Sequence, residues 1–529
     1  MSGRAELTAL DRVVGWLSPV AGLRRVQARA AYAKVSGYIG ARRDRSSMRS
    51  WNTQGASADA DTLPDLDTLR ARSRDLVRND PLAQSAIATK VVNVVGTGHV
   101  VRPEIDHERL GISRDQADEW EGLALDIWTN WAESPDCDVT RTQTFAELED
   151  LMYRSRLLSG DVLAIRRFRP RKGRLLATCL QVVEADRLSN PNWQPDSATL
   201  AGGIALDEDG APTHYHFANR HAIDRHRQGA VSWQTIPAYD RVGDKLVLHV
   251  HGVRWRPDMS RYAPLLAPVI ESLKQRSRYS EAELMAAVVS ACFTIGLRSE
   301  DGDLGAQLGA TNAASGQSKG AAPINIVEPG QIFDILPNEE VKGFTPGRPN
   351  PQFSPFIDAI AQEIGTGTDL PYELLMKKFQ ASYSASRAAL EMAWQFFRTD
   401  RKLHVTQFCK PVYADVIAEA IARGRLKAPG FFADPLIRSA WLSAEWMGPA
   451  RPTIDPTKDA DADAKYLDMG ATSLTRITAE RFGADFRSVR RRRSQDGSDG
   501  YSSKPNPAPG STAKQDAEDD DNDNDLETE

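Results

Sequence analysis

The sequence has few of the residues from which catalytic and cross-linked sites are usually built. Its 529 residues include only four cysteines, Cys137, Cys179, Cys292 and Cys409. They are scattered along the chain and form no C-x-x-C pair, which argues against structural disulfides and against a cysteine-built zinc site. We therefore expect four buried free thiols.

Long hydrophobic runs are also missing. The longest mostly apolar stretch, 284–297, is LMAAVVSACFTIGL. It is shorter than the roughly 20 residues that a helix needs to cross a bilayer. The first residues, MSGRAELTALDRVVGW, do not contain the apolar core of a signal peptide. These absences predict a protein without a membrane partner that is made and kept in a cytoplasm.

Sequence motifs of catalysis and nucleotide binding are absent or lie in the wrong setting. No Walker A motif and no H-E-x-x-H occur, and Gly96-Thr97-Gly98 lacks the third glycine of a dinucleotide site. The segment 316–320, GQSKG, fits G-x-S-x-G around Ser318. It lies in low-complexity sequence rather than between a strand and a helix. We predict no enzyme, no catalytic residue and no cofactor.

Histidines cluster in one region, because six of the nine lie between residues 214 and 251. His214 and His216 would share one face of a strand, as would His249 and His251. These four histidines could together bind a metal ion, so one alternative stays open, a nucleic-acid-processing enzyme with a histidine-based metal site. No carboxylate lies at a recognisable ligand spacing, however, so we predict no metal ligands.

Charge is distributed unevenly, although the formal net charge is only −6. Residues 1–49 carry ten Lys and Arg against three acidic residues, whereas 494–529 carry eleven Asp and Glu against two Lys. Four arginines, Arg490 to Arg493, precede the acidic end. This balance disfavours a second alternative, a DNA-binding scaffold without a channel, and it predicts flexible ends.

The periodicity of the remaining chain predicts an α+β protein. The segment 69–95 reads as two helices that meet at Asp80, which would cap the second helix, and Pro81, which would occupy its first position. Strands are expected between 161 and 255, with a hairpin turn at 207–210. Helices are expected over 113–131, 145–158, 264–297, 356–364, 434–444 and 457–485, and short strands over 324–327 and 331–336.

A long helix is predicted from Ser386 to Arg423, a length of roughly 57 Å at 1.5 Å per residue. Ser384 or Ser386 would cap its start. Pro411 lacks an N–H and its ring crowds the preceding turn, so the helix should kink or break near 409–412. An ordinary long core helix would show the same pattern.

Four segments in this order and spacing resemble the lambda-type family of phage portal proteins: 69–98, 263–293, 328–390 and 440–486. The resemblance covers residues 60 to 490. Some family members have Asn-Tyr-Ser-Ser where this chain has Ser382-Tyr383-Ser384-Ala385, and the Gly/Ser-rich stretch 301–322 is irregular.

The resemblance implies a portal-type α+β subunit with a helical and β-rich wing, a helical stem, a small clip, a long kinked helix and a helical crown. The implied parts are a basic N-terminal arm (1–60), wing (61–262), stem helix (263–298), clip (299–349), second stem helix (350–366), channel loop (367–385), long kinked helix (386–424), crown (425–490) and disordered acidic tail (491–529).

The resemblance also implies a ring of about twelve subunits that closes head to tail around a DNA channel at one capsid vertex. The ring would nucleate prohead assembly, dock the terminase large subunit, contact the major capsid or scaffold protein and receive head-completion and tail connector proteins. It would be a virion component, assembled in the host bacterial cytoplasm. Double-stranded DNA would pass Lys377 and Lys378, which the family places at the narrowest part of the channel. Two solvated lysines at a helix end are the alternative interpretation.

Overall fold

The computed structural model describes residues 13–14, 16–21, 23–25, 27, 50–51, 53, 55–221, 224, 230–291, 295–298, 332–335, 350–379, 382–453 and 455–496. The chain divides into two compact units, 1–60 and 61–529, and nearly all described residues belong to the second. Most of the expected arm and clip, the segments 301–322 and 324–327, and residues 497–529 of the expected tail lie outside the described residues.

Two helices open the second unit and meet where the sequence predicts. Helix α3 (Ala58–Asn79) begins earlier than the predicted residue 69, and α4 (Pro81–Val94) begins at its proline. The Asp80 side chain accepts hydrogen bonds from the backbone N–H groups of Leu82 (2.8 Å) and Ala83 (3.2 Å). The predicted cap at Asp80 is therefore confirmed.

Two further helices precede the sheet. Helix α6 (Arg114–Ala132) starts with a capping box at Ser113, and α7 (Phe145–Ser159) ends at Gly160. Gly160 has a φ of 89°, and a Cβ atom there would lie 1.9 Å from the carbonyl oxygen of Tyr262. Only glycine permits this close crossing of two backbones. Short helices are α5 (His107–Leu110) and the 3₁₀ turns Pro135–Cys137, Ala185–Arg187, Pro191–Trp193 and Ala267–Val269.

The β-rich part forms two antiparallel sheets, as the alternating pattern over 161–255 predicts. One sheet has the order β3–β2–β8 and the other β4–β5–β6–β7. The strands are β2 (Asp161–Phe168), β3 (Thr178–Val183), β4 (Leu200–Ala201), β5 (Ile204–Leu206), β6 (Pro212–Ala218), β7 (Trp233–Pro237) and β8 (Val247–His251). Buried side chains of both sheets, including Leu163 and Phe217, share one core.

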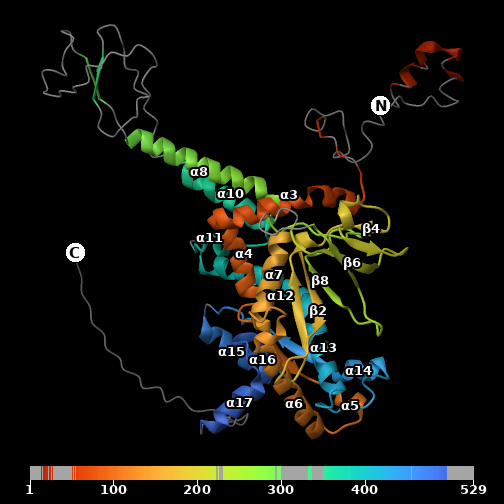
Figure 1. Ribbon diagram of the computed structural model, residues 1–529. Coiled ribbons are helices and arrows are strands. Elements are labelled where there is room, and N and C mark those ends of the chain that lie inside the picture. Colours follow the sequence, from red (N-terminus) through yellow and green to blue (C-terminus); the bar gives the residue numbers. More distant parts are fainter. Residues whose placement is uncertain are drawn as a thin grey trace, which may run out of the picture. The chain divides into compact units, whose positions relative to one another are not determined.

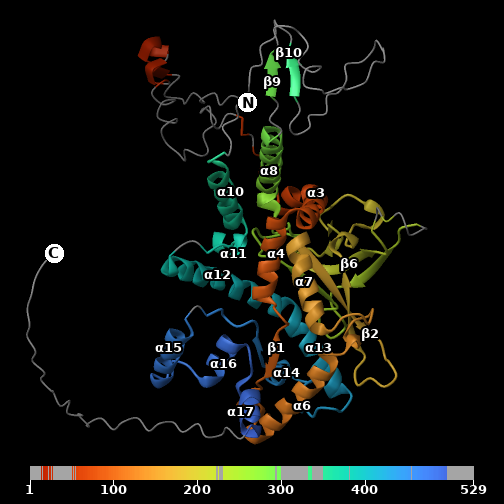
Figure 2. The ribbon, with the colours of Figure 1, turned by 90° about the vertical axis from the view of Figure 1, so that its left-hand side faces the viewer.

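A pair of helices extends from this body, α8 (Ile270–Ala291) and α10 (Phe353–Gly367), which lie side by side in Figures 1 and 2. Helix α8 ends before the predicted residue 297, and β9 (Ile295–Arg298) pairs in parallel with β10 (Ile332–Ile335). The sequence TIGL at 294–297 explains the difference, because β-branched residues and glycine disfavour helix.

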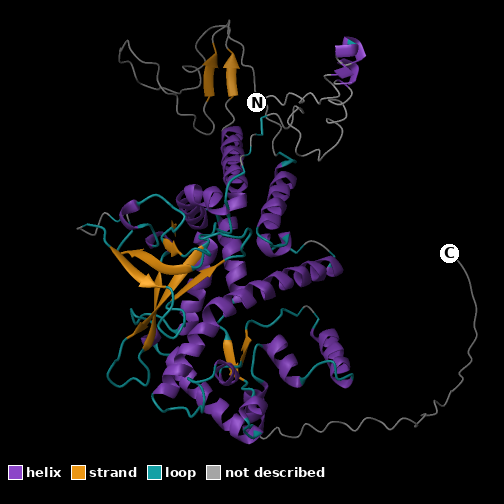
Figure 3. Ribbon diagram, turned by 90° about the vertical axis from the view of Figure 1, so that its right-hand side faces the viewer, coloured by secondary structure: helices purple, strands orange, loops and turns teal. Residues whose placement is uncertain are grey.

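The long helical segment runs from Tyr383 to Ala422 in three parts: α12 (Tyr383–His404), a π-helix (Val405–Cys409) and α13 (Lys410–Ala422). The backbone N–H of Lys410 donates to the carbonyl of Val405, five residues back. The axis changes direction between α12 and α13 (Figures 2 and 3). The widened turn lies directly before Pro411, whose ring would crowd a normal α-turn.

The C-terminal part differs from the expectation in three places. Strand β11 (Ala444–Met447) was not predicted, and it pairs with β1 (Val100–Pro103). The predicted helix over 434–444 is α14 (Pro435–Trp441), and that over 457–485 is split into α15 (Pro456–Asp468) and α16 (Leu474–Phe482). Helix α17 (Phe486–Gln495) contains residues 491–495, so the predicted start of the tail at 491 is wrong.

Two large cores join these elements. Side chains of α6, α7, β2, β8 and α13 form one core, in which the rings of Phe145 and Phe408 stack at 5.4 Å. The other lies between α4, α7, α8, α10, α11 (Tyr372–Met376) and α12. Among the described residues, no helix is long and apolar enough to cross a membrane.

Candidate functional site

The loop between α11 and α12 carries the two predicted channel lysines. Lys377 ends α11 with a φ of 55° and is exposed, and Lys378 is half-buried. Within the described part of the chain, neither ammonium group has an ion-pair partner. Phe379 follows with 56% of its surface exposed. The loop therefore presents two free cations and an aromatic ring.

Helix α11 holds this loop against the end of α10. The hydroxyl of Ser85 on α4 donates to the carbonyl of Leu375 (2.8 Å), and the Tyr372 hydroxyl bonds to Asp358 on α10 (2.6 Å). A Cβ atom at Gly365 would lie 2.5 Å from the carbonyl oxygen of Leu370. Because α4 and α10 both hold α11, the position of the lysines is set by folded structure rather than by the loop alone.

The other two predicted structural residues, Ser384 and Pro411, lie in α12 and α13. Ser384 is exposed in the first helical turn, but the capping residue is Ser382, whose hydroxyl accepts from the N–H of Ala385 at 3.4 Å. The expected cap at Ser384 or Ser386 is therefore wrong, because the helix starts earlier than the spacing of apolar residues suggested. Pro411 lies beyond the π-helix, in the first turn of α13.

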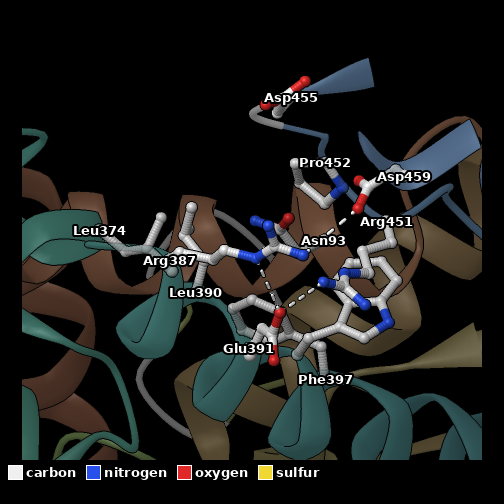
Figure 4. A pocket seen from close by; sticks show the side chains of 11 residues that line it. Asn93, Leu374, Arg387, Leu390, Glu391, Phe397, Arg451, Pro452, Asp455 and Asp459 are labelled. Carbon is white, nitrogen blue, oxygen red and sulfur yellow. Dashed lines mark hydrogen bonds and ion pairs between the residues drawn. The ribbon is translucent and has the colours of Figure 1, made fainter. Parts of the chain in front are cut away.

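The exposed side of α12 is bound to the C-terminal helices by a chain of ion pairs (Figure 4). Arg387 contacts Glu391 (3.3 Å) and Asp459 of α15 (3.4 Å), and Arg451 also contacts Glu391 (2.8 Å). Arg481 of α16 contacts Asp459 at 3.1 Å. These pairs line a hollow between α12 and the segment that leads into α15, and they fix the C-terminal helices on α12.

His214, His216, His249 and His251 do not come together in the structure as a group of metal ligands. His216 Nδ1 lies 2.9 Å from the hydroxyl of Thr235, and His249 Nε2 lies 3.3 Å from Asp161. His251 stacks on Tyr262 at 4.0 Å between ring centroids. Burial and the neighbouring His249 lower the pKa of His251 to about 4. These rings serve packing and hydrogen bonding. Ser318 lies outside the described residues.

Asp161 is the centre of a buried ionic cluster that the sequence did not indicate. Its carboxylate contacts Arg70 of α3 (2.7 Å) and Arg261 (2.7 Å), and all three side chains are nearly inaccessible. Burial alone would raise the pKa of Asp161, but Arg261 and Arg70 hold it well below its ordinary value. The cluster ties α3 and the segment before α8 to the first residue of β2.

Glu149 of α7 is the centre of a second buried polar cluster. Its carboxylate accepts from the backbone N–H of His99 (2.7 Å) and lies 3.3 Å from His99 Nδ1 and 2.9 Å from Cys409 Sγ. Burial and the Glu149 carboxylate raise the pKa of Cys409 well above its ordinary value, so the thiol donates its proton. The three residues are far apart in the sequence, which is why no motif revealed them.

Comparison with known proteins gives these features a context. The family model for phage portal protein, lambda family, matches residues 44–401. The chain is 25% identical over 471 residues to portal protein B of Escherichia phage lambda, covering 84% of this chain and 85% of that protein. It is also 25% identical over 464 residues to the portal protein of Escherichia phage N15, with 84% and 86% covered.

Chains from gene transfer agent particles are among the solved structures with similarity. A chain in the neck of the empty particle, computed with C6 symmetry, matches with a TM-score of 0.39 and 14% identity over 77% of this chain and 92% of that one. A chain in the neck of the native particle, computed with C12 symmetry, gives 0.37 and 14% over 79% and 98%. Because the family model covers more than half of the sequence, this chain belongs to the lambda family of phage portal proteins.

Proposed function

We propose that about twelve copies of this chain close into a ring around a DNA channel at one capsid vertex. Double-stranded DNA enters through this channel during packaging and leaves through it at ejection. The observation that carries the proposal is the family match over 44–401, which contains every element from α3 through most of α12. That span includes the α8–α10 pair and the lysine loop.

Two different apolar surfaces support a head-to-tail ring. Helix α8 exposes Leu284 (65%) and Met285 (61%), whereas α12 exposes Met392 (62%) and Phe396 (42%) one turn apart on one face. A ring built from heterologous contacts needs two distinct, complementary surfaces on each subunit. Large exposed apolar side chains at both places are of the kind that such contacts bury.

We assign the parts of the subunit accordingly. The wing comprises α3 to β8, the stem α8 and α10, the clip the segment 299–349 and the crown the region from 425 to the end of α17. The role is structural rather than catalytic and takes place in the virion. The terminase large subunit, the major capsid or scaffold protein, and the head-completion and tail connector proteins are the proposed partners.

The two lysines form a narrow basic collar in this proposal. Repeated around the ring, Lys377 and Lys378 would meet the DNA backbone, which carries about one negative charge per 1.7 Å of duplex. The formal net charge of −6 per chain means that the rest of the ring does not add a strong basic field. A thin collar retains DNA without stopping its movement along the channel.

Imaging of the purified, assembled protein by electron microscopy tests the ring. A particle with roughly twelvefold symmetry and an axial pore is the expected result. Particles of any symmetry without a central hole would instead favour a scaffold that binds DNA without a channel.

Replacement of both Lys377 and Lys378 by alanine tests the collar. Retention of packaged DNA in a phage assembly assay should fall, while rings form normally and stability changes by no more than about 0.5 kcal/mol. The double variant Lys402→Ala, Lys410→Ala, which removes two exposed lysines near the other end of α12, is the matched control. Equal DNA retention in both double variants would contradict the collar.

A further inference from the structure

Glu149 is a buried carboxylate that lacks a cationic partner. Its side chain is inaccessible, and among the described residues it forms no ion pair with lysine or arginine. Its neighbours are His99, through the backbone N–H and Nδ1, and the thiol of Cys409. Burial of a charge is costly unless the charge is paired or bound to a metal ion. The Glu149 carboxylate therefore lacks the Lys or Arg partner that would complete an ion pair.

A tight turn brings His99 to this carboxylate. Gly98 has a φ of 99°, and a Cβ atom there would lie 2.6 Å from the Cβ atom of Ala146 on α7. Only glycine lets the turn close against the helix, which places the next residue, His99, beside Glu149. Cys409 arrives from a third direction as the last residue of the π-helix. Three separate segments thus deliver one nitrogen, one oxygen and one sulfur to a single point.

A second histidine lies beside the cluster with no partner of its own. His404 is completely buried, and neither of its ring nitrogens has a hydrogen-bond partner within the described structure. The same holds for Nε2 of His99. The two rings are 6.1 Å apart between centroids. Unpaired buried nitrogens are rare in folded proteins, and here they gather beside a carboxylate and a thiol.

We propose that His99, Glu149 and Cys409 bind one zinc ion in the interior of the subunit. The three ligand atoms lie within 4.8 Å of one another. The 3.3 Å between His99 Nδ1 and Glu149 Oε2 equals the separation of about 3.3 Å that two ligands have in a tetrahedral zinc site. Cys409 Sγ lies 2.9 Å from the other oxygen of the same carboxylate, Oε1.

We assign His404 as the fourth zinc ligand, because neither of its buried ring nitrogens has a hydrogen-bond partner within the described structure and its ring lies next to that of His99. Imidazole, thiolate and carboxylate together favour zinc over magnesium or calcium, which bind oxygen ligands. On binding, the proton of the Cys409 thiol leaves to solvent as the zinc–sulfur bond forms. The ion supplies the positive charge that Glu149 lacks. It also links the residue before β1 and helix α7 to the π-helix, where the axis changes direction.

Metal analysis of the full chain, purified without chelator, tests the site independently of ring formation. About one zinc ion per chain is expected. Cobalt added to chelator-treated protein should give the charge-transfer absorption of a thiolate ligand. Cys409→Ser should lose the zinc and the absorption band, whereas Cys137→Ser, which removes another buried thiol, should keep both.

The test remains decisive if Cys409→Ser fails to fold, because zinc content and cobalt absorption are measured on the unmodified chain. His404→Gln serves as the second variant and should weaken zinc binding without abolishing it. Absence of zinc after purification, together with absence of the cobalt band, would overturn the proposal. So would zinc that survives in Cys409→Ser in the same amount as in Cys137→Ser.

Discussion

Among the described residues, Asp161 and Glu149 are the two carboxylates with no accessible surface, and the structure compensates them in different ways. Asp161 receives two guanidinium groups, each at 2.7 Å, so its charge is neutralised within the protein. Glu149 receives a backbone N–H, an imidazole and a thiol, and no Lys or Arg of the described chain reaches it. Asp161, which is paired with two arginines, therefore has a structural role. Glu149 lies instead among side chains of the types that bind metal ions, and this difference is the basis of the proposed zinc site.

The first prediction breaks the ionic cluster. Asp161→Asn keeps the size of the side chain but leaves Arg261 buried without its carboxylate partner and leaves Arg70 with only Asp186, at 3.5 Å. Removal of one partner from a buried pair costs about 3–5 kcal/mol in the free energy of unfolding. Urea denaturation followed by circular dichroism would measure it. Asp150→Asn, which removes a surface i,i+4 pair with Arg154 on α7, should cost less than about 0.5 kcal/mol. Similar losses in both variants would contradict this account.

The second prediction concerns Glu149→Gln and depends on zinc. Without metal, the substitution removes a buried carboxylate that has no Lys or Arg partner in the described chain, so the unfolding free energy should change by less than about 1 kcal/mol or rise. With zinc, the unmodified chain should be stabilised and the variant should not, since a ligand that binds only the folded state shifts the equilibrium toward it. Thermal unfolding with zinc and with chelator measures both cases. A large loss of unfolding free energy in Glu149→Gln in the presence of chelator would show that protein groups already stabilise the carboxylate without zinc.

The third prediction uses pH. The folded-state pKa of Asp161 lies well below its ordinary value, so its ionic contribution to stability is present above about pH 4 and is lost as the pH falls further. The unmodified chain should therefore lose more stability between pH 4 and pH 2 than Asp161→Asn does. Urea titrations at several acidic pH values would measure the slopes. Parallel slopes for the two proteins would remove Asp161 as the cause.

Much of the local structure could be predicted because its causes lie within a few residues. Asp80 and Pro81 specify a helix start, since one supplies a capping oxygen and the other needs no hydrogen bond there. Pro411 indicated a disturbed helix, and the π-helix lies immediately before it. The start of α12 was misplaced because several serines compete for the cap. The tail boundary was misplaced because α17 carries an arginine run on a helix with no buried residues.

The residues of the candidate sites also differ in how far the sequence could predict them. Lys377 and Lys378 could be proposed because the resemblance gave the loop a location, although composition alone would have treated them as surface charges. In the sequence, Gly96-Thr97-Gly98 lacks the third glycine of a dinucleotide site. In the structure, Gly98 packs on α7 and delivers His99 to Glu149. Sequence spacing gave no sign of this role.

The sequence by itself determined the helix start at Asp80 and Pro81, the alternating strands, the membership of a family and the position of the disturbed long helix. These features depend on neighbouring residues or on patterns that recur along the chain. Only the tertiary structure decided which buried charges meet, because Asp161 and Arg261 are 100 residues apart and Glu149 and Cys409 are 260 residues apart. The reason is physical. A buried charge needs a partner within a few ångströms, and chain folding alone sets distances of that size between remote residues.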